Sequence, residues 1–95
     1  MISDEAVAQR LSELGHPTRL AVYRLLVKGS KTGMTVGDVQ QQLGIPGSTL
    51  SHHLSRLIQA GLVQQTREGR ILRCQVDMDA LDEVIDYLKA ECCTL

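Results

Sequence analysis

Apolar residues recur along most of this chain at spacings of three and four, and this period predicts five helices that each bury one face. Capping residues and glycines indicate where the helices begin and end. The expected helices are Asp4–Leu14 after a Ser3 cap, 17–29 after His16 at the cap position, 35–43 opened by Thr35, 48–60, and a last helix capped by Asp79 that includes Leu88.

A β-hairpin is expected between the fourth helix and the last one. Residues 62–66 alternate weakly between apolar and polar side chains, and Ile71–Val76 forms the return strand, with Leu72, Cys74 and Val76 on one face. The turn, residues 67–70, includes a glycine at a position suited to positive φ. This order of elements (α-α-α-α-β-β-α) predicts a mainly α-helical, winged helix-turn-helix fold in which residues 1–95 form a single domain.

The fourth predicted helix has two faces of different chemistry. Leu50, Leu54 and Leu57 share one face when residues are placed 100° apart. The opposite face carries hydrogen-bonding groups and one cation, but no carboxylate. Its residues are Ser48, His52, Ser55, Arg56 and Gln59. Such a face suits the major groove of DNA, whereas an ordinary solvated helix mixes charges of both signs.

Two adjacent histidines point in different directions from this helix. His52 lies in the middle of the polar face, within reach of a base edge or a phosphate. His53 lies at the border of the apolar face, where we expect a packed structural histidine. Because neighbouring residues on a helix point about 100° apart, the two rings do not ligate one metal ion.

Charge is distributed unevenly along the sequence. Residues 15–76 hold eight basic and two acidic side chains, whereas the two ends together hold nine acidic and two basic ones. A basic centre between acidic flanks indicates a body that binds a polyanion, rather than a winged helix used only for protein contact. The absence of Phe and Trp disfavours single-stranded nucleic acid, which is bound by aromatic stacking. Double-stranded DNA is therefore the expected partner.

Several other classes of protein are disfavoured. No P-loop, Gly-x-Gly-x-x-Gly or Gly-x-Ser-x-Gly motif occurs, so we do not expect an enzyme. We expect no secretion signal in the first residues, and no apolar run approaches the roughly 20 residues that span a bilayer. The three cysteines, Cys74, Cys92 and Cys93, make a poor disulfide framework, which predicts a cytoplasmic protein with reduced thiols.

Several short segments carry a resemblance to a known family. They are Leu43-Gly44-Ile45, Ser48-Thr49-Leu50-Ser51-His52-His53-Leu54-Ser55-Arg56-Leu57, Ala60-Gly61-Leu62-Val63 and Arg67-Glu68-Gly69-Arg70. Together with Gly15-His16-Pro17-Thr18-Arg19-Leu20, they closely resemble the ArsR/SmtB family of bacterial transcriptional repressors. The sequence departs from the family pattern at His16, where Asp is usual, and at Pro46-Gly47, where a polar pair is more usual.

The resemblance implies a homodimer whose recognition helix, residues 48–60, enters the major groove of an operator. By position it implies DNA contacts, without a cofactor, from Ser48, Thr49, Ser51, His52 and Arg56 in the helix and from Arg67 and Arg70 in the wing. It also implies that the first and last helices form the dimer interface. Their apolar residues exceed what a chain of this size is expected to bury alone: Val7, Leu11, Leu14, Leu81, Val84, Ile85 and Leu88.

The family senses ions at several alternative places, and Cys92-Cys93 resembles a C-terminal arsenic site of some members. Residues 35–39 lack a thiol and the last helix lacks histidine, which disfavours the other sites. Trivalent arsenic and antimony prefer thiolates. The expected inducers are arsenite, methylarsenite or antimonite. Arsenite takes three thiolates, methylarsenite needs two, and Cys74 is the candidate third ligand, although its strand position favours core packing.

Two alternatives remain open for Cys92 and Cys93. Exposed paired thiols oxidise readily, so the same repressor fold would also serve a redox or sulfide sensor. The second alternative is that they are tail residues without a function, because chain ends tolerate most substitutions.

Overall fold

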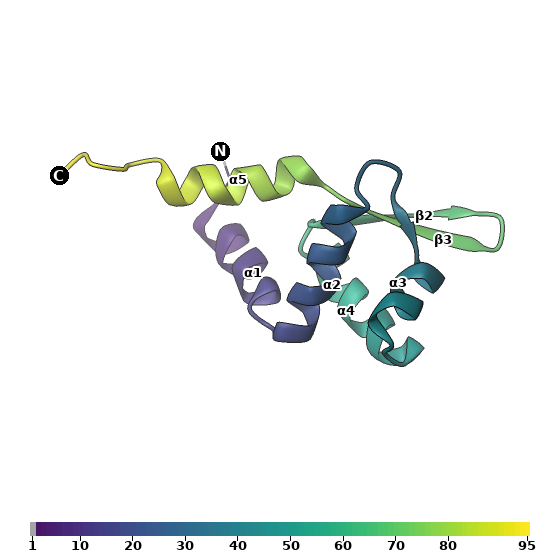
Figure 1. Ribbon diagram of the computed structural model, residues 1–95. Coiled ribbons are helices and arrows are strands. Elements are labelled where there is room, and N and C mark those ends of the chain that lie inside the picture. The colour runs from purple at the N-terminus through teal and green to yellow at the C-terminus, as the bar shows by residue number, and fades with distance from the viewer. Residues whose placement is uncertain (1) are drawn as a thin grey trace.

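The elements lie along one elongated body in the computed structural model, which describes residues 2–95 (Figure 1). Their bounds are α1 (Asp4–Leu14), α2 (Pro17–Lys28), β1 (Met34–Thr35), α3 (Val36–Leu43), α4 (Gly47–Gln59), β2 (Val63–Glu68), β3 (Ile71–Val76) and α5 (Met78–Lys89). The body measures 52 × 23 × 20 Å, and it runs from the C-terminal tail and α5 to the β2–β3 hairpin. The predicted winged helix-turn-helix is confirmed.

Side-chain caps begin three of the helices at the predicted places. The Ser3 hydroxyl accepts a hydrogen bond from the Ala6 N–H at 3.2 Å, and the Thr35 hydroxyl accepts one from the Asp38 N–H at 3.0 Å. At α2 the acceptor is His16 Nδ1, 3.2 Å from the Thr18 nitrogen. Each cap satisfies an N–H group that has no partner within its own helix.

Two helix starts differ from the prediction. Asp77, not Asp79, caps α5, and its carboxylate accepts from the Ala80 N–H at 3.1 Å. The reason is that β3 ends at Val76, so Asp77 is the first residue outside the sheet and Asp79 already lies in the first helical turn. α4 begins one residue early, at Gly47, with Pro46 as its N-cap.

The sheet has one strand more than predicted and a longer hairpin. β1 pairs antiparallel with β3, with Met34 opposite Cys74, which gives the strand order β1-β3-β2. Two residues show no alternation, so the sequence carried no signal for β1. Pairing in the hairpin continues to Glu68 opposite Ile71, so the turn contains only two residues, with Gly69 at a φ of 64°.

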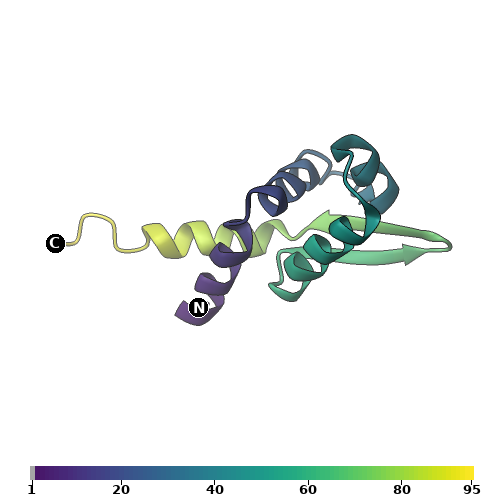
Figure 2. The ribbon, with the colours of Figure 1, turned by 90° about the horizontal axis from the view of Figure 1, so that it is seen from below.

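One apolar core connects the helix-turn-helix to the sheet. Its fully buried side chains are Val22, Leu26, Val39, Leu50, Leu57, Leu62 and Cys74. Cys74 is a core residue, as its strand position predicted. Figure 2 shows α4 alongside the hairpin, with α1 crossing α5 towards the other end of the molecule. The core therefore fixes the outer face of α4 relative to the wing.

The terminal helices leave apolar side chains exposed, although fewer than the sequence indicated. Leu11, Ile85 and Leu88 are 40%, 43% and 60% exposed. Val7 and Val84, which we expected at a dimer interface, are buried within the single chain, because α1 and α5 pack against the rest of the body. In residues 2–95, no helix is long and apolar enough to cross a membrane.

Candidate DNA interface

α4 presents the polar face that its sequence predicts. Leu50, Leu54 and Leu57 are buried, and the polar residues of the opposite face are all exposed. Those exposed residues include every helix position to which DNA contact was assigned: Ser48, Thr49, Ser51, His52 and Arg56. The helix phase is therefore confirmed, and contact of these residues with DNA stays a prediction.

The two histidines lie as their phases predicted. His53 is buried, and its Nδ1 accepts a hydrogen bond from Arg19 Nε at 3.3 Å. Its ring centroid lies 4.9 Å from that of His16. Burial, together with the nearby positive charge of Arg19, lowers the pKa of His53 and keeps its ring neutral. His52 is exposed on the outer face and remains the histidine available to a base edge.

The N-terminal end of α4 suits a phosphate group. Pro46 has no side-chain group that caps the helix, and the first turn carries no acidic residue. Ser48 and Thr49 in this turn are exposed. Uncapped N–H groups at a helix N-terminus favour an anion, because they combine hydrogen-bond donors with the positive end of the helix dipole. Pro46-Gly47 therefore still leaves the helix end able to accept phosphate.

The wing carries two arginines at its outer end. Arg67 and Arg70 flank the turn at Gly69, are exposed, and form no ion pair within residues 2–95. The one acidic residue beside them, Glu68, pairs with Arg73 of the neighbouring strand. This pairing neutralises Glu68, so the outer end of the wing remains positive and suited to a phosphate backbone.

Arg56 differs from the other assigned residues because it is already engaged within the chain. Its guanidinium donates two hydrogen bonds to the carboxylate of Glu13, which is buried and also pairs with Arg19. The sequence did not reveal this contact, because Glu13 lies 43 residues away in α1 and was counted with the acidic N-terminal flank. No signal within one sequence indicates such a pairing.

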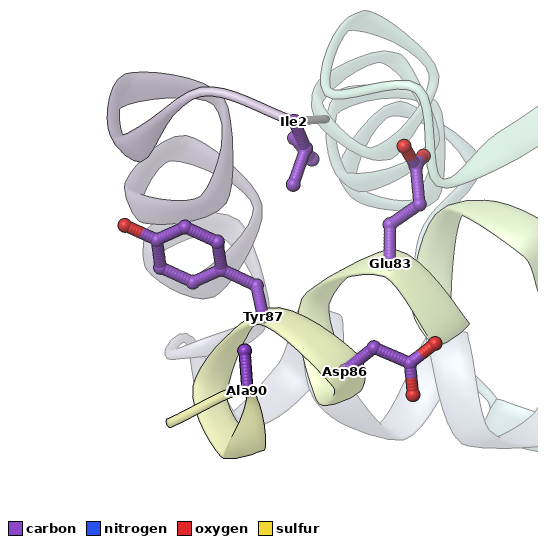
Figure 3. Close-up of a pocket in the computed structure, with 5 residues that line it drawn as sticks. All are labelled: Ile2, Glu83, Asp86, Tyr87 and Ala90. Carbon is purple, nitrogen blue, oxygen red and sulfur yellow. The ribbon is translucent and has the colours of Figure 1, made fainter. Parts of the chain in front are cut away.

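The surface has two hollows of interest, one beside the candidate DNA interface and one along α5. A groove of about 420 Å³ between α4 and the hairpin is lined partly by neutral polar residues, including Ser51, Ser55 and Gln65. A smaller pocket of about 240 Å³ lies beneath Ile2 and along α5, with Tyr87 in its wall (Figure 3). Its polar rim is acidic, with Glu83 and Asp86, so this second pocket does not suit DNA.

The predicted inducer-site cysteines lie beyond the end of α5. The sulfur atoms of Cys92 and Cys93 are 2.9 Å apart and both residues are exposed. Their contact raises the pKa of Cys92, whereas burial raises the pKa of Cys74. Cys74 is buried in the core, and residues 2–95 of one chain contain no cluster of three His, Cys, Asp or Glu side chains able to hold a metal ion. Its role as a third ligand stays a prediction.

The fold and the outer face of α4 define a DNA-binding regulator of the helix-turn-helix class. The sequence model of the helix-turn-helix domain family matches residues 14–66. A biofilm growth-associated repressor of Xylella fastidiosa strain Temecula1 is 32% identical over 93% of this chain and 75% of its own length. The HTH-type transcriptional regulator YgaV of Escherichia coli is 28% identical over 96% of this chain and 90% of its own length.

Similar solved structures belong to the same class of transcriptional regulators as these relatives. The transcriptional repressor BigR from Xylella fastidiosa superposes with a TM-score of 0.68 at 31% identity, over 94% of this chain and 88% of its own. An ArsR-like transcriptional regulator from Rhodococcus shares the fold, with a TM-score of 0.80 at 20% identity over 90% and 78%. The chain belongs to the ArsR family of winged helix-turn-helix transcriptional repressors.

Proposed function

We propose that this repressor works as a homodimer that binds an imperfect inverted repeat at a promoter and is released when a soft metalloid binds Cys92 and Cys93. The observation that carries the DNA-binding part is the exposed, acid-free face of α4 above a fully buried leucine face. We expect this binding to require no cofactor, because side chains and helix N–H groups can supply the contacts. We expect the protein to act in the cytoplasm, where the DNA is and where thiols stay reduced.

Exposed apolar side chains on the terminal helices support the dimer. Leu11 on α1 and Ile85 and Leu88 on α5 remain accessible in the single chain, and burying them against a second copy removes this surface from water. A structural neighbour from Mycobacterium bovis, 22% identical with a TM-score of 0.72, is described as homodimeric. A two-fold symmetric dimer presents two recognition helices, which fits an inverted repeat.

The thiol pair supports the metalloid part of the proposal. Trivalent arsenic binds thiolates, and two exposed sulfur atoms 2.9 Å apart meet the demand of methylarsenite for two ligands. Inorganic arsenite needs a third thiolate, which Cys74 does not supply within one chain. The partner subunit or a thiol in solution would have to supply it. A neighbour described as a possible transcriptional regulator for arsenical resistance is 26% identical, with a TM-score of 0.74 over 86% of this chain and 82% of its own.

A DNA-release titration tests this proposal. Promoter DNA bound by the wild-type protein is titrated in parallel with methylarsenite, arsenite, antimonite, zinc, cadmium and sulfide. We expect methylarsenite, arsenite or antimonite to lower DNA affinity by about 5- to 150-fold, the range of typical allosteric couplings. Cys92→Ser or Cys93→Ser should abolish the response without weakening DNA binding. A double variant that still responds to arsenic would rule out this site.

Cys74→Ser is the matched control for the thiol pair. It should reduce stability, because a hydroxyl would replace a thiol in the apolar core, and it should leave the methylarsenite response intact. Loss of the arsenite response alone in this variant would indicate a three-thiolate site that includes Cys74.

A redox or sulfide sensor is the second candidate, favoured by the same sulfur contact. Oxidation of the pair would join Cys92 Sγ to Cys93 Sγ and pass two electrons and two protons to an oxidant. Release of DNA by peroxide, or by sulfide only when peroxide is present as the oxidant, but not by any arsenical, would select this function. The cysteine variants would abolish that response as well, so the ligand series separates the two candidates.

A further inference from the structure

A buried carboxylate from α1 lies behind the outer face of the recognition helix. The Glu13 side chain is only 6% exposed and pairs with two arginines from two other helices. Arg56 of α4 donates from Nε to Oε2 at 2.7 Å and from Nη2 to Oε1 at 3.0 Å. Arg19 of α2 donates from Nη1 to Oε1 at 3.3 Å. The cluster therefore joins α1, α2 and α4.

Arg19 of α2 also holds the carboxylate in place. Arg19 Nη1 also donates to the Glu13 carbonyl oxygen at 3.3 Å, and Arg19 Nε donates to the buried His53. Hydrogen bonding by Arg56, the largest cause, lowers the pKa of Glu13, so the group is ionised at neutral pH. A buried charge persists when it is paired, and here the pairing fixes the position of both carboxylate oxygens.

Arg56 uses only one edge of its guanidinium for this contact. Its Nε and Nη2 face Glu13, whereas Nη1 makes no hydrogen bond within residues 2–95 and the side chain is 49% exposed. A two-bond contact sets the plane of the guanidinium as well as its position. The free edge therefore lies in a defined orientation on the same outer face as His52.

We infer that Glu13 is a positioning residue for DNA recognition, which fixes the Arg56 guanidinium so that its free edge contacts the operator. This inference rests on the proposed DNA-binding function. It predicts that neutralising Glu13 changes DNA affinity in the direction opposite to that expected from charge repulsion alone. Removing a negative charge near a polyanion site should otherwise strengthen DNA binding, because DNA is repelled by carboxylates. If Glu13 positions Arg56, its neutralisation weakens operator binding instead.

The first test compares Glu13→Gln with the wild type on two duplexes. One is enriched from a randomised pool by the wild-type protein, and the other is an alternating copolymer without an operator. We expect about tenfold weaker binding to the enriched duplex, the value of one hydrogen bond to a charged group, and no loss on the copolymer. Glu5→Gln removes the same charge from an exposed position of α1 and should not weaken binding. Equal or tighter operator binding by Glu13→Gln would overturn the inference.

A second variant tests the inference even if Glu13→Gln fails to fold. Arg56→Lys changes a half-exposed residue, keeps the positive charge and cannot form the two-bond contact. It should bind the copolymer as the wild type does and the enriched duplex about tenfold more weakly. Wild-type operator affinity in Arg56→Lys would show that the fixed guanidinium is not used, which contradicts the inference.

A double variant measures the coupling between the two residues. In an Arg56→Ala background, Glu13→Gln should cause no further loss of operator affinity, because the group that it positions is absent. An additive loss would contradict the inference. Failure of the proposed function gives a different result, since the wild-type protein would then enrich no duplex from the pool.

Discussion

The two ends of the molecule expose different kinds of surface. The recognition end, which consists of α3, α4 and the β2–β3 hairpin, buries Leu50, Leu54 and Leu57 and exposes mostly polar and basic side chains, together with Ile71. The terminal end, which consists of α1, α5 and residues 90–95, exposes Leu11, Ile85 and Leu88 among carboxylates. One chain therefore offers a surface suited to a polyanion and a separate surface suited to another protein, and the charge distribution keeps the two apart.

α1 also connects these two ends through its own arginine, Arg10. Arg10 Nη1 donates to the Ala80 carbonyl of α5 at 2.8 Å, and its Nε donates to the Ala60 carbonyl at the end of α4 at 3.3 Å. With Glu13 about one turn further along the same helix, α1 contacts both the recognition helix and the last helix. The surfaces differ in chemistry, but they are joined by one rigid element.

The largest expected difference between the ends is in the stability of the folded chain. Leu57→Ala should lower the free energy of unfolding by about 2–5 kcal/mol, because Leu57 is fully buried and its loss leaves a cavity. Leu88→Ala, at a 60% exposed position, should change the stability of the monomer little and weaken self-association instead. Chemical denaturation of both variants measures the free energy of unfolding, and sedimentation of both variants measures self-association. A monomeric wild-type protein at micromolar concentration would contradict the assignment of the terminal end.

The next effect concerns sequence preference at the recognition end. His52→Ala should weaken operator binding by roughly 1–3 kcal/mol and reduce discrimination between bases, as the loss of a base contact does. Binding to the enriched duplex and to single-base variants of it measures both quantities. Unchanged affinity and unchanged preference would show that the outer face of α4 does not read the operator.

A smaller effect is expected from the wing. Arg70→Ala should weaken binding to specific and non-specific DNA alike, and it should reduce the slope of log affinity against log salt by about one, as the loss of a phosphate contact does. Titrations at several salt concentrations give the slope. If only operator binding fell, Arg70 would be contacting a base instead of the backbone.

The smallest effect is a pH dependence of stability that originates behind the recognition helix. Burial lowers the pKa of His53, so the unfolded chain binds a proton more readily than the folded chain. This contribution to stability is complete above the unfolded pKa of about 6.5 and is lost as the pH falls through the folded pKa. Urea midpoints should therefore decrease from pH 7 towards pH 5. His53→Gln should flatten this decrease, and an unchanged slope would rule out His53 as its source.

The sequence predicted most of the fold because the relevant signals are local. The leucine spacing of α4, the caps at Ser3 and Thr35 and the glycine of the hairpin turn each lie within a few residues of the structure that they specify. The misplaced cap at Asp79 arose because two aspartates, Asp77 and Asp79, lie close together and only the end of β3 decides between them.

The parts that sequence did not predict depend on contacts between distant residues. The pairing of Glu13 with Arg56 and that of β1 with β3 join segments about 40 residues apart. Burial of Val7 and Val84 depends on how the terminal helices cross, which periodicity alone does not specify. The exposed face of the candidate site was therefore predicted, and the support beneath it was not.

The junction between the wing and the last helix has a consequence for operator geometry. β3 ends at Val76 and α5 begins at Met78, so a single residue, Asp77, separates them, and its N–H is bonded to the Leu62 carbonyl at 2.9 Å. One inserted residue here would turn the exposed face of α5 by about 100° relative to the wing. In a dimer joined through α5, the distance between the two wings is thus set by chain length at one position. In such a dimer this junction would also set the spacing of the two DNA half-sites, because it contains no additional residue that could accommodate a different spacing.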